Sequence, residues 1–296
     1  MHAYLPGIGF SNIHSRRTMD QLAEDVIKNC DNKAVFHTED GRLMAEFSKK
    51  YARNAGITAV GELDQAGEFR LEYTYPYYQG TRITLKEDLT IERQTGREAY
   101  AGACDDPRLG ITLIFYMTNM GEFLGLSEAR ALTAGPKPVI LSAIAMEGMV
   151  ILPIRQTTEL ENIRRRADIK RKKLMNAARD GDEEAIESLT MADYDTYNLL
   201  SQRVMREDIL SIVESYIMPC GVECDQYNIL GTIRHMTDVR NDLTGETLCQ
   251  MLVECNDMPI SVCINKADLW GEPAVGRRFK GRVWMMGKVL FRHDVT

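Results

Sequence analysis

The sequence predicts an α+β protein with an N-terminal antiparallel sheet carrying two helices, a helical connector and a small C-terminal β-barrel. Three observations predict it: short strand-like runs with turn residues before residue 155, a charged helical pattern after it, and strand-like runs again from residue 219. At 296 residues the chain exceeds the length at which one hydrophobic core usually stops growing. We therefore expect an α+β domain over residues 1–155, a helical connector over 156–218 and a β-barrel over 219–296.

The composition is that of an acidic protein with packed cores. The formal net charge is −7 at pH 7, the pI is about 5.4, and 44% of the residues are hydrophobic. Such a charge repels nucleic acid on average. The seven cysteines form no short disulfide framework, and the first residues show no basic segment leading into an apolar run. The longest apolar region, residues 138–154, is interrupted by polar residues. These features predict a cytoplasmic protein without a membrane span.

The N-terminal half predicts one helix and a series of hairpins. Residues 3–10 predict a short strand, and the capping box of Thr18 to Gln21 opens a helix with a regular apolar face. Strand-like runs on either side of glycine-containing turns predict hairpins. The expected strand pairs are residues 34–37 with 43–47, 57–62 with 68–75, 89–93 with 98–104, and 138–145 with 149–154.

The candidate catalytic residues are Cys104, Asp105, Asp106 and Arg108. Asp106 suits a helix N-cap and a proline follows it, so we expect a helix over residues 107–124, although residues 111–116 also fit a strand. Near a helix N-terminus the Cys104 thiolate is stabilised and Arg108 assists, whereas the two aspartates oppose this. A cysteine hydrolase also needs a histidine base, and none of the five histidines lies in a recognisable partner motif. Capping and structural roles are therefore favoured.

The helical connector begins at a second capping box, Thr158 to Glu161, and carries the densest basic run of the chain, residues 164–173. Between residues 157 and 187 there are eight cations and eight anions, and the basic residues surround the helix. This pattern favours a solvated helix over a nucleic-acid surface. At the end of the connector, Cys220 and Cys224 lack the second ligand pair that a zinc site needs, so we expect no metal.

The C-terminal block has the most regular β pattern. We expect strands over residues 226–234, 247–254, 260–264 and 278–291, closing into a barrel like the oligonucleotide/oligosaccharide-binding (OB) fold. Such barrels often bind single-stranded nucleic acid by charge and stacking. The candidate binding residues are Arg277, Arg278, Lys280, Arg282 and Trp284. The run Asn265 to Asp268 matches the guanine-reading motif of GTPases, but the chain contains no phosphate-binding loop to accompany it.

Three motifs give the chain a family resemblance. They are Cys104 to Asp106 with residues 110–116, Pro219 to Asp225 with Tyr227, and Gly271 to Pro273 with residues 276–281. Together they resemble a family of bacterial proteins of about this length that is classified as a domain of unknown function. The resemblance spans nearly the whole chain and implies no substrate, cofactor or catalytic residue. The family pattern has an aromatic residue where this chain has Cys220, which weakens a metal site there further.

We therefore interpret the protein as a non-catalytic interaction or regulatory module without a cofactor, acting on a protein partner or through self-association. The alternative is nucleic-acid binding by the C-terminal barrel with help from the basic helix. A second alternative is a hydrolase whose site lies near Cys104, Asp105 and Asp106.

Overall fold

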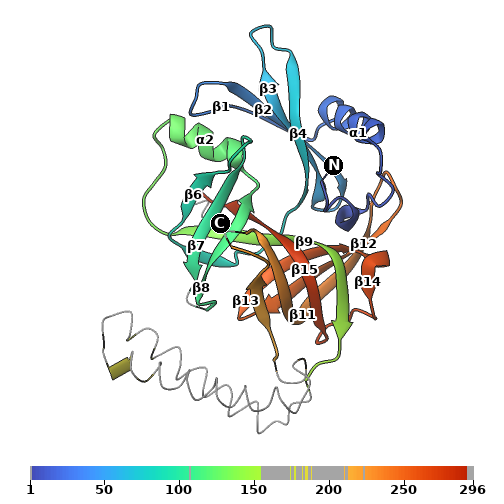
Figure 1. Cartoon of the computed structure of the whole chain (residues 1–296), viewed down its shortest axis with the longest axis vertical. Coiled ribbons are helices and arrows are strands. Elements are labelled where there is room, and N and C mark those ends of the chain that lie inside the picture. The colour runs from blue at the N-terminus through green and yellow to red at the C-terminus, as the bar shows by residue number, and fades with distance from the viewer. Residues whose placement is uncertain are drawn as a thin grey trace. The chain divides into compact units, whose positions relative to one another are not determined.

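The computed structural model describes residues 2–106, 108–154, 213–222 and 224–291, with isolated positions between 174 and 210. The chain divides into two compact units, one formed by Met1–Leu152 with Ser215–Thr296 and the other by Pro153–Glu214. Most of the second unit, and with it the predicted helical connector, lies outside the described residues. The first unit is mostly β and contains two sheets and two α-helices (Figure 1).

The first sheet has four antiparallel strands in sequence order, so that each strand pairs with its neighbour in the chain. The strands are β1 (Asn32–His37), β2 (Leu43–Ala52), β3 (Ala55–Leu63) and β4 (Phe69–Tyr78). Both hairpins that the sequence predicts in this region are confirmed. The reason is local: Gly41 and Gly67 adopt φ of 82° and 81° in the turns, a conformation that side chains disfavour.

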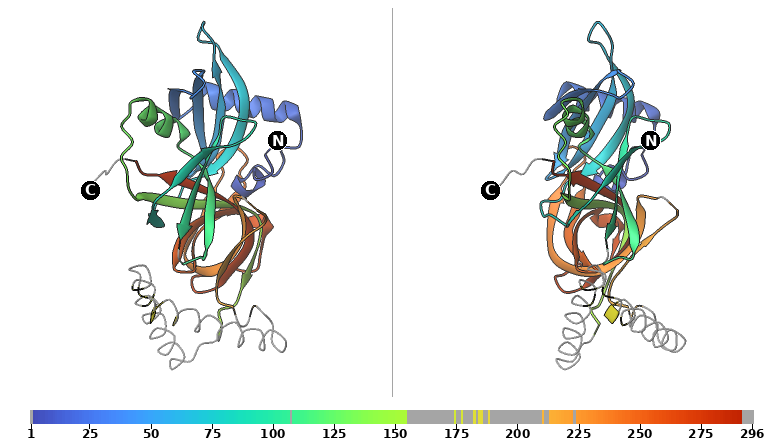
Figure 2. Two further views of the ribbon diagram at one scale, coloured as in Figure 1. Left: turned by 60° about the vertical axis from the view of Figure 1, so that its left-hand side comes forward. Right: turned by 90° about the vertical axis from the view of Figure 1, so that its left-hand side faces the viewer.

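The second sheet runs in the order β10-β11-β12-β13-β9-β15-β8-β7-β6, with β5 and β14 also paired to β9. Because β11 pairs with β15 as well as β12, the pairings from β11 through β12, β13, β9 and β15 return to β11 (Figure 2). The strands are β5 (Leu85–Glu87), β6 (Thr90–Arg93), β7 (Tyr100–Asp106), β8 (Ile111–Met117), β9 (Lys137–Ile151), β10 (Tyr216–Pro219), β11 (Gln226–Arg240), β12 (Thr247–Cys255), β13 (Met258–Asn265), β14 (Leu269–Trp270) and β15 (Arg278–Val289).

Strand β9 pairs the N-terminal half of the chain with strands of the C-terminal half. It comes from the N-terminal half, yet it lies between β13 and β15 of the C-terminal block. The predicted domains 1–155 and 219–296 therefore contribute strands to one sheet and belong to one compact unit. An OB-like barrel made by the C-terminal residues alone is not confirmed.

The predicted hairpin over residues 138–154 is wrong, because β9 is one continuous strand. Gly148, which suggests a turn in the sequence, is needed inside the strand for packing. A Cβ atom there would lie 2.4 Å from the ring of Phe279. A glycine within a strand can mark such a close approach as well as a turn.

Three further predictions need correction. The expected helix over residues 107–124 is wrong: a turn at Gly110 (φ 66°) leads into β8, and helix α2 (Met120–Glu128) begins later. Residues 3–10 contain a short 3-10 helix (Pro6–Ile8) instead of a strand. The predicted N-terminal helix is confirmed as α1 (Arg16–Lys28), but its cap is Ser15, whose side chain accepts a hydrogen bond from the backbone of Thr18. No helix among the described residues is long and apolar enough to span a membrane.

Candidate functional site

The sequence-predicted residue Cys104 lies on β7 with 4% of its surface exposed. Burial and the nearby carboxylates of Asp106 and Glu87 raise the pKa of its thiol to about 12. A thiol with such a pKa stays protonated at neutral pH, and the thiolate is the nucleophile. The environment of Cys104 is therefore that of a packed core residue.

The carboxylate of the neighbouring Asp106 forms an ion pair with Arg108. The Asp106 side chain is fully buried, and its Oδ1 accepts hydrogen bonds of 2.9 Å from both the backbone N and Nε of Arg108. Oδ2 accepts from Nε at 3.1 Å, and Nη1 of Arg108 donates to the carbonyl of Asp257 at 3.3 Å. Asp105 accepts from the hydroxyl of Thr112 at 2.6 Å. These bonds hold the turn between β7 and β8 in place and occupy the groups that a hydrolase would use.

The C-terminal binding candidates do not form one surface. Trp284 is 3% exposed and donates from Nε1 to Asp225 at 2.8 Å, so it cannot stack on a base. Arg278 is 5% exposed and donates from Nε to the carbonyl of Leu152. Arg277 donates to the carbonyl of Glu272 at 2.6 Å, whereas Arg282 is exposed and donates to Gln226 at 2.7 Å. Lys280 is half-buried, so the five residues divide between core and surface.

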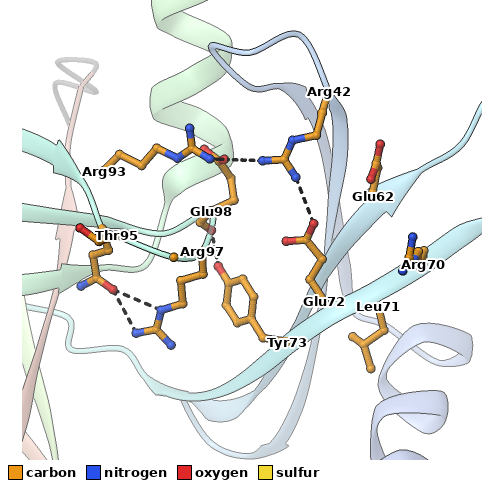
Figure 3. A pocket seen from close by; sticks show the side chains of 12 residues that line it. Arg42, Glu62, Arg70, Leu71, Glu72, Tyr73, Arg93, Thr95, Arg97 and Glu98 are labelled. Atoms are coloured by element: carbon orange, nitrogen blue, oxygen red, sulfur yellow. Dashed lines mark hydrogen bonds and ion pairs between the residues drawn. The ribbon is translucent and has the colours of Figure 1, made fainter.

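A pocket of the described structure lies elsewhere, between the first sheet and the turn that joins β6 to β7 (Figure 3). Its volume is about 790 Å³, within the range of small-molecule sites. Its lining is unusual in being mostly charged. The lining residues are Arg42, Glu62, Arg70, Leu71, Glu72, Tyr73, Arg93, Gln94, Thr95, Gly96, Arg97 and Glu98. We call this site the arginine pocket.

A bulge in β4 explains why the successive residues Glu72 and Tyr73 both face the arginine pocket. Tyr73 pairs with Val60 and Leu71 pairs with Gly61, which leaves Glu72 as an extra residue. A side chain at Gly61 would lie 2.1 Å from the carbonyl oxygen of Arg70, so the close approach requires glycine. Bulges re-aim side chains next to binding sites. Here the bulge directs Glu72 to Arg42, with Oε1 3.0 Å from Nη1.

Two of the four arginines in the pocket are neutralised by carboxylates. The side chain of Glu98 is fully buried and accepts from Nη2 of Arg42 at 2.9 Å and from Nη2 of Arg93 at 2.7 Å. The hydroxyl of Tyr100 donates to Oε1 of Glu98 at 3.0 Å. Arg42 also pairs with Asp40 at 3.1 Å and with Glu72. Arg42 and Arg93 are therefore fixed parts of the wall.

The other two arginines keep their charge available. Arg97 donates from Nε and Nη2 to the side-chain oxygen of Gln94, at 3.3 and 3.0 Å, and Gln94 is neutral. The guanidinium of Arg97 lies 5.6 Å from the ring centroid of Tyr73. Arg70 pairs in register with Glu62 on β3, but neither Arg70 nor Arg97 has a carboxylate oxygen within 4.0 Å among the described residues. The pocket thus presents two cations without an ion-pair partner among the described residues, here called uncompensated, and Asp225 acts on Arg97 only electrostatically.

A buried carboxyl, Glu46, lies on the same face of the first sheet, in register with Val60 and hence with Tyr73. The backbone N–H of Gly121 in the first turn of α2 donates to it, while its Oε1 has no hydrogen-bond partner in the described structure. Burial raises the pKa of Glu46 to about 7. Burial also keeps the pKa values of Tyr73 and Tyr75 well above the ordinary range, so both phenols stay protonated at neutral pH.

The arrangement is suited to binding. Guanidinium groups recognise carboxylates and phosphates through paired hydrogen bonds. The pocket lining contains no cysteine or histidine, and the described residues contain no group of three side chains able to hold a metal ion. A local signal was present in the sequence, since residues 93, 97 and 98 carry charges on both sides of a turn. The partners from β2 and β4 were not predictable, because only the fold brings them together.

The family model described as a domain of unknown function, E. rectale gene description (DUF3881), matches residues 5–287. The chain belongs to this family. The family resemblance seen in the sequence motifs is thereby confirmed, and the function of the protein is unknown. No curated protein and no solved structure is significantly similar to the chain.

Proposed function

We propose that the protein is a non-catalytic regulatory binding protein whose arginine pocket takes up an anionic small molecule. The observation that carries this proposal is the pair of uncompensated guanidinium groups, Arg70 and Arg97, in a pocket of about 790 Å³. An ordinary small-molecule pocket has a mainly apolar lining with few polar groups. The lining has four arginines and three glutamates, so its formal charge is +1, which favours a ligand that carries negative charge.

The regulatory part of the proposal rests on the fixed geometry of the wall. Glu98 holds Arg42 and Arg93 in place, so the ligand meets groups that are already positioned. Preorganised groups lose less conformational freedom on binding. A protein partner or self-association, which the sequence led us to expect, would then respond to the occupied state. Both this partner and the cytoplasmic location stay predictions.

The test is a thermal-shift and calorimetric measurement with simple carboxylates and phosphates against chloride at equal ionic strength. We expect the anions to raise the melting temperature, and Arg97→Glu to abolish the shift without unfolding the protein. Arg17→Glu is the matched control, because Arg17 is exposed on α1, outside the pocket. Equal shifts with chloride and with the other anions would refute the proposal.

The nucleic-acid alternative has weaker support. The ring of pairings through β9, β11, β12, β13 and β15 is the feature that still favours an OB-like barrel. Against a stacking role, Trp284 is buried. Salt-dependent titration of a labelled oligonucleotide decides the matter, since binding by phosphate contacts gives a steep log-log slope and no such slope is expected here.

A further inference from the structure

The arginine pocket places its two uncompensated cations on different structural elements. Arg70 comes from β4 of the first sheet, and Arg97 follows the turn that joins β6 to β7 of the second. Figure 3 shows Tyr73 between them, whereas Leu71 projects from the other side of β4. A single small anion placed against one guanidinium therefore leaves the other without a partner.

The surface between the two cations is less polar. The ring of Tyr73, which lies on the same face of the first sheet as Arg70, forms part of the lining. The Tyr73 hydroxyl is not directed to a ligand, because it donates to the backbone carbonyl of Glu98. The part of Tyr73 that a ligand can contact is its ring, which suits a short hydrocarbon segment.

The neighbouring acidic groups restrict where the negative charges of a ligand can lie. Glu72 and Glu98 are saturated by Arg42 and Arg93, so the centre of the wall has little net positive charge to offer. Glu62 pairs in register with Arg70 and repels an anion that approaches from the β3 side. The favourable positions for anionic groups are thus the exposed side of Arg70 and the exposed side of Arg97.

We propose that the ligand is a compound with two anionic groups joined by a short apolar spacer, with one anionic group on Arg70, the other on Arg97 and the spacer beside the ring of Tyr73. This inference rests on the proposed function of the arginine pocket and deepens it by defining the ligand class. The anionic groups are carboxylates or phosphates, since guanidinium groups bind both in the same geometry.

The test is calorimetric titration with linear dicarboxylates of increasing chain length, with the monocarboxylate of equal length as the control for each. We expect one chain length to bind best and to bind at least about tenfold more tightly than its monocarboxylate. Pyrophosphate against inorganic phosphate forms a parallel pair of probes. Tighter binding in the first pair identifies carboxylates as the recognised groups, and tighter binding in the second pair identifies phosphates.

Two variants locate the two contacts. Arg70→Gln and Arg97→Gln should each reduce the affinity for the best dianion to that of the matching monoanion, about tenfold, while Arg17→Gln leaves it unchanged. If mono- and dianions bind equally tightly, or if Arg70→Gln has no effect, the dianion proposal is wrong and the pocket is a site for one anion. If neither kind of anion binds, the proposed function fails as well.

Discussion

The arginine pocket and the turn between β7 and β8 that contains Asp106 both bury a carboxylate against arginine. They differ in the number of arginines that remain without a carboxylate partner. In the turn, one carboxylate meets one arginine, and Arg108 is fully engaged with Asp106 and the Asp257 carbonyl. In the pocket, the buried Glu98 together with Glu72 neutralises Arg42 and Arg93, and two more arginines have no ion-pair partner among the described residues. Charge that is satisfied inside the fold stabilises structure, whereas surplus charge beside a cavity is available to a ligand.

Removal of the pocket carboxylate is expected to have the largest effect on stability. Glu98→Gln weakens the bonds to Arg42, Arg93 and Tyr100, but the two arginines are 30% and 38% exposed and can turn to water, so the loss is about 2–3 kcal/mol. Urea unfolding measures this change. The control is Glu72→Gln, since Glu72 bonds to Arg42 from the bulge, with 30% of its side chain exposed, and should cost under about 1 kcal/mol. Equal costs for the two variants would contradict the central role of Glu98.

Glu46 gives the pocket region a pH dependence. Burial raises its native-state pKa to about 7, above the value of about 4.3 in an unfolded chain. The neutral carboxyl therefore favours the native state, and this stabilisation is complete below about pH 4 and lost as the pH rises through 7. Glu46→Gln should raise the stability at about pH 8 by about 2 kcal/mol and have little effect at about pH 4.

The measurement for Glu46 is the free energy of unfolding between these two pH values. Glu122→Gln, in the same first turn of α2 but exposed, is the control and should leave the pH profile unchanged. A profile for Glu46→Gln that runs parallel to that of the wild type would show that Glu46 does not titrate in this range.

Asp106→Asn tests whether the turn between β7 and β8 contributes to stability and not to anion binding. The variant keeps the size of the side chain but weakens the bond to Arg108, whose side chain is 30% exposed and can turn to water. We expect a loss of about 1–2 kcal/mol in the free energy of unfolding and no change in anion binding to the pocket. A variant that folds normally but loses anion binding would mean that the turn belongs to the site.

The smallest expected effect is chemical modification of the Cys104 thiol. Because burial raises its thiol pKa to about 12, alkylation of the folded protein at neutral pH should leave Cys104 unmodified while the exposed Cys220 reacts. Mass spectrometry of the digested protein identifies the modified residue. Rapid modification of Cys104 would restore the hydrolase alternative.

Local signals predicted the hairpins well, because turn glycines and alternating runs act over a few residues. They failed where a distant part of the chain decides the structure. Gly148 suggests a turn, but its neighbour in space is Phe279, more than a hundred residues away. The motif at Cys104 suggests chemistry because its charges are adjacent in the sequence. In the arginine pocket, Arg70 and Arg97 meet only after two sheets have formed, so no short window contains both.

The position of β9 has a consequence for synthesis of the protein on the ribosome. Its partners β13 and β15 are made last, so β9 emerges long before the strands that cover it. Pairings between distant segments form slowly, and an uncovered apolar strand attracts other chains. A nascent chain that stops near residue 152 would therefore expose β9 without these two partners until the last strands are made.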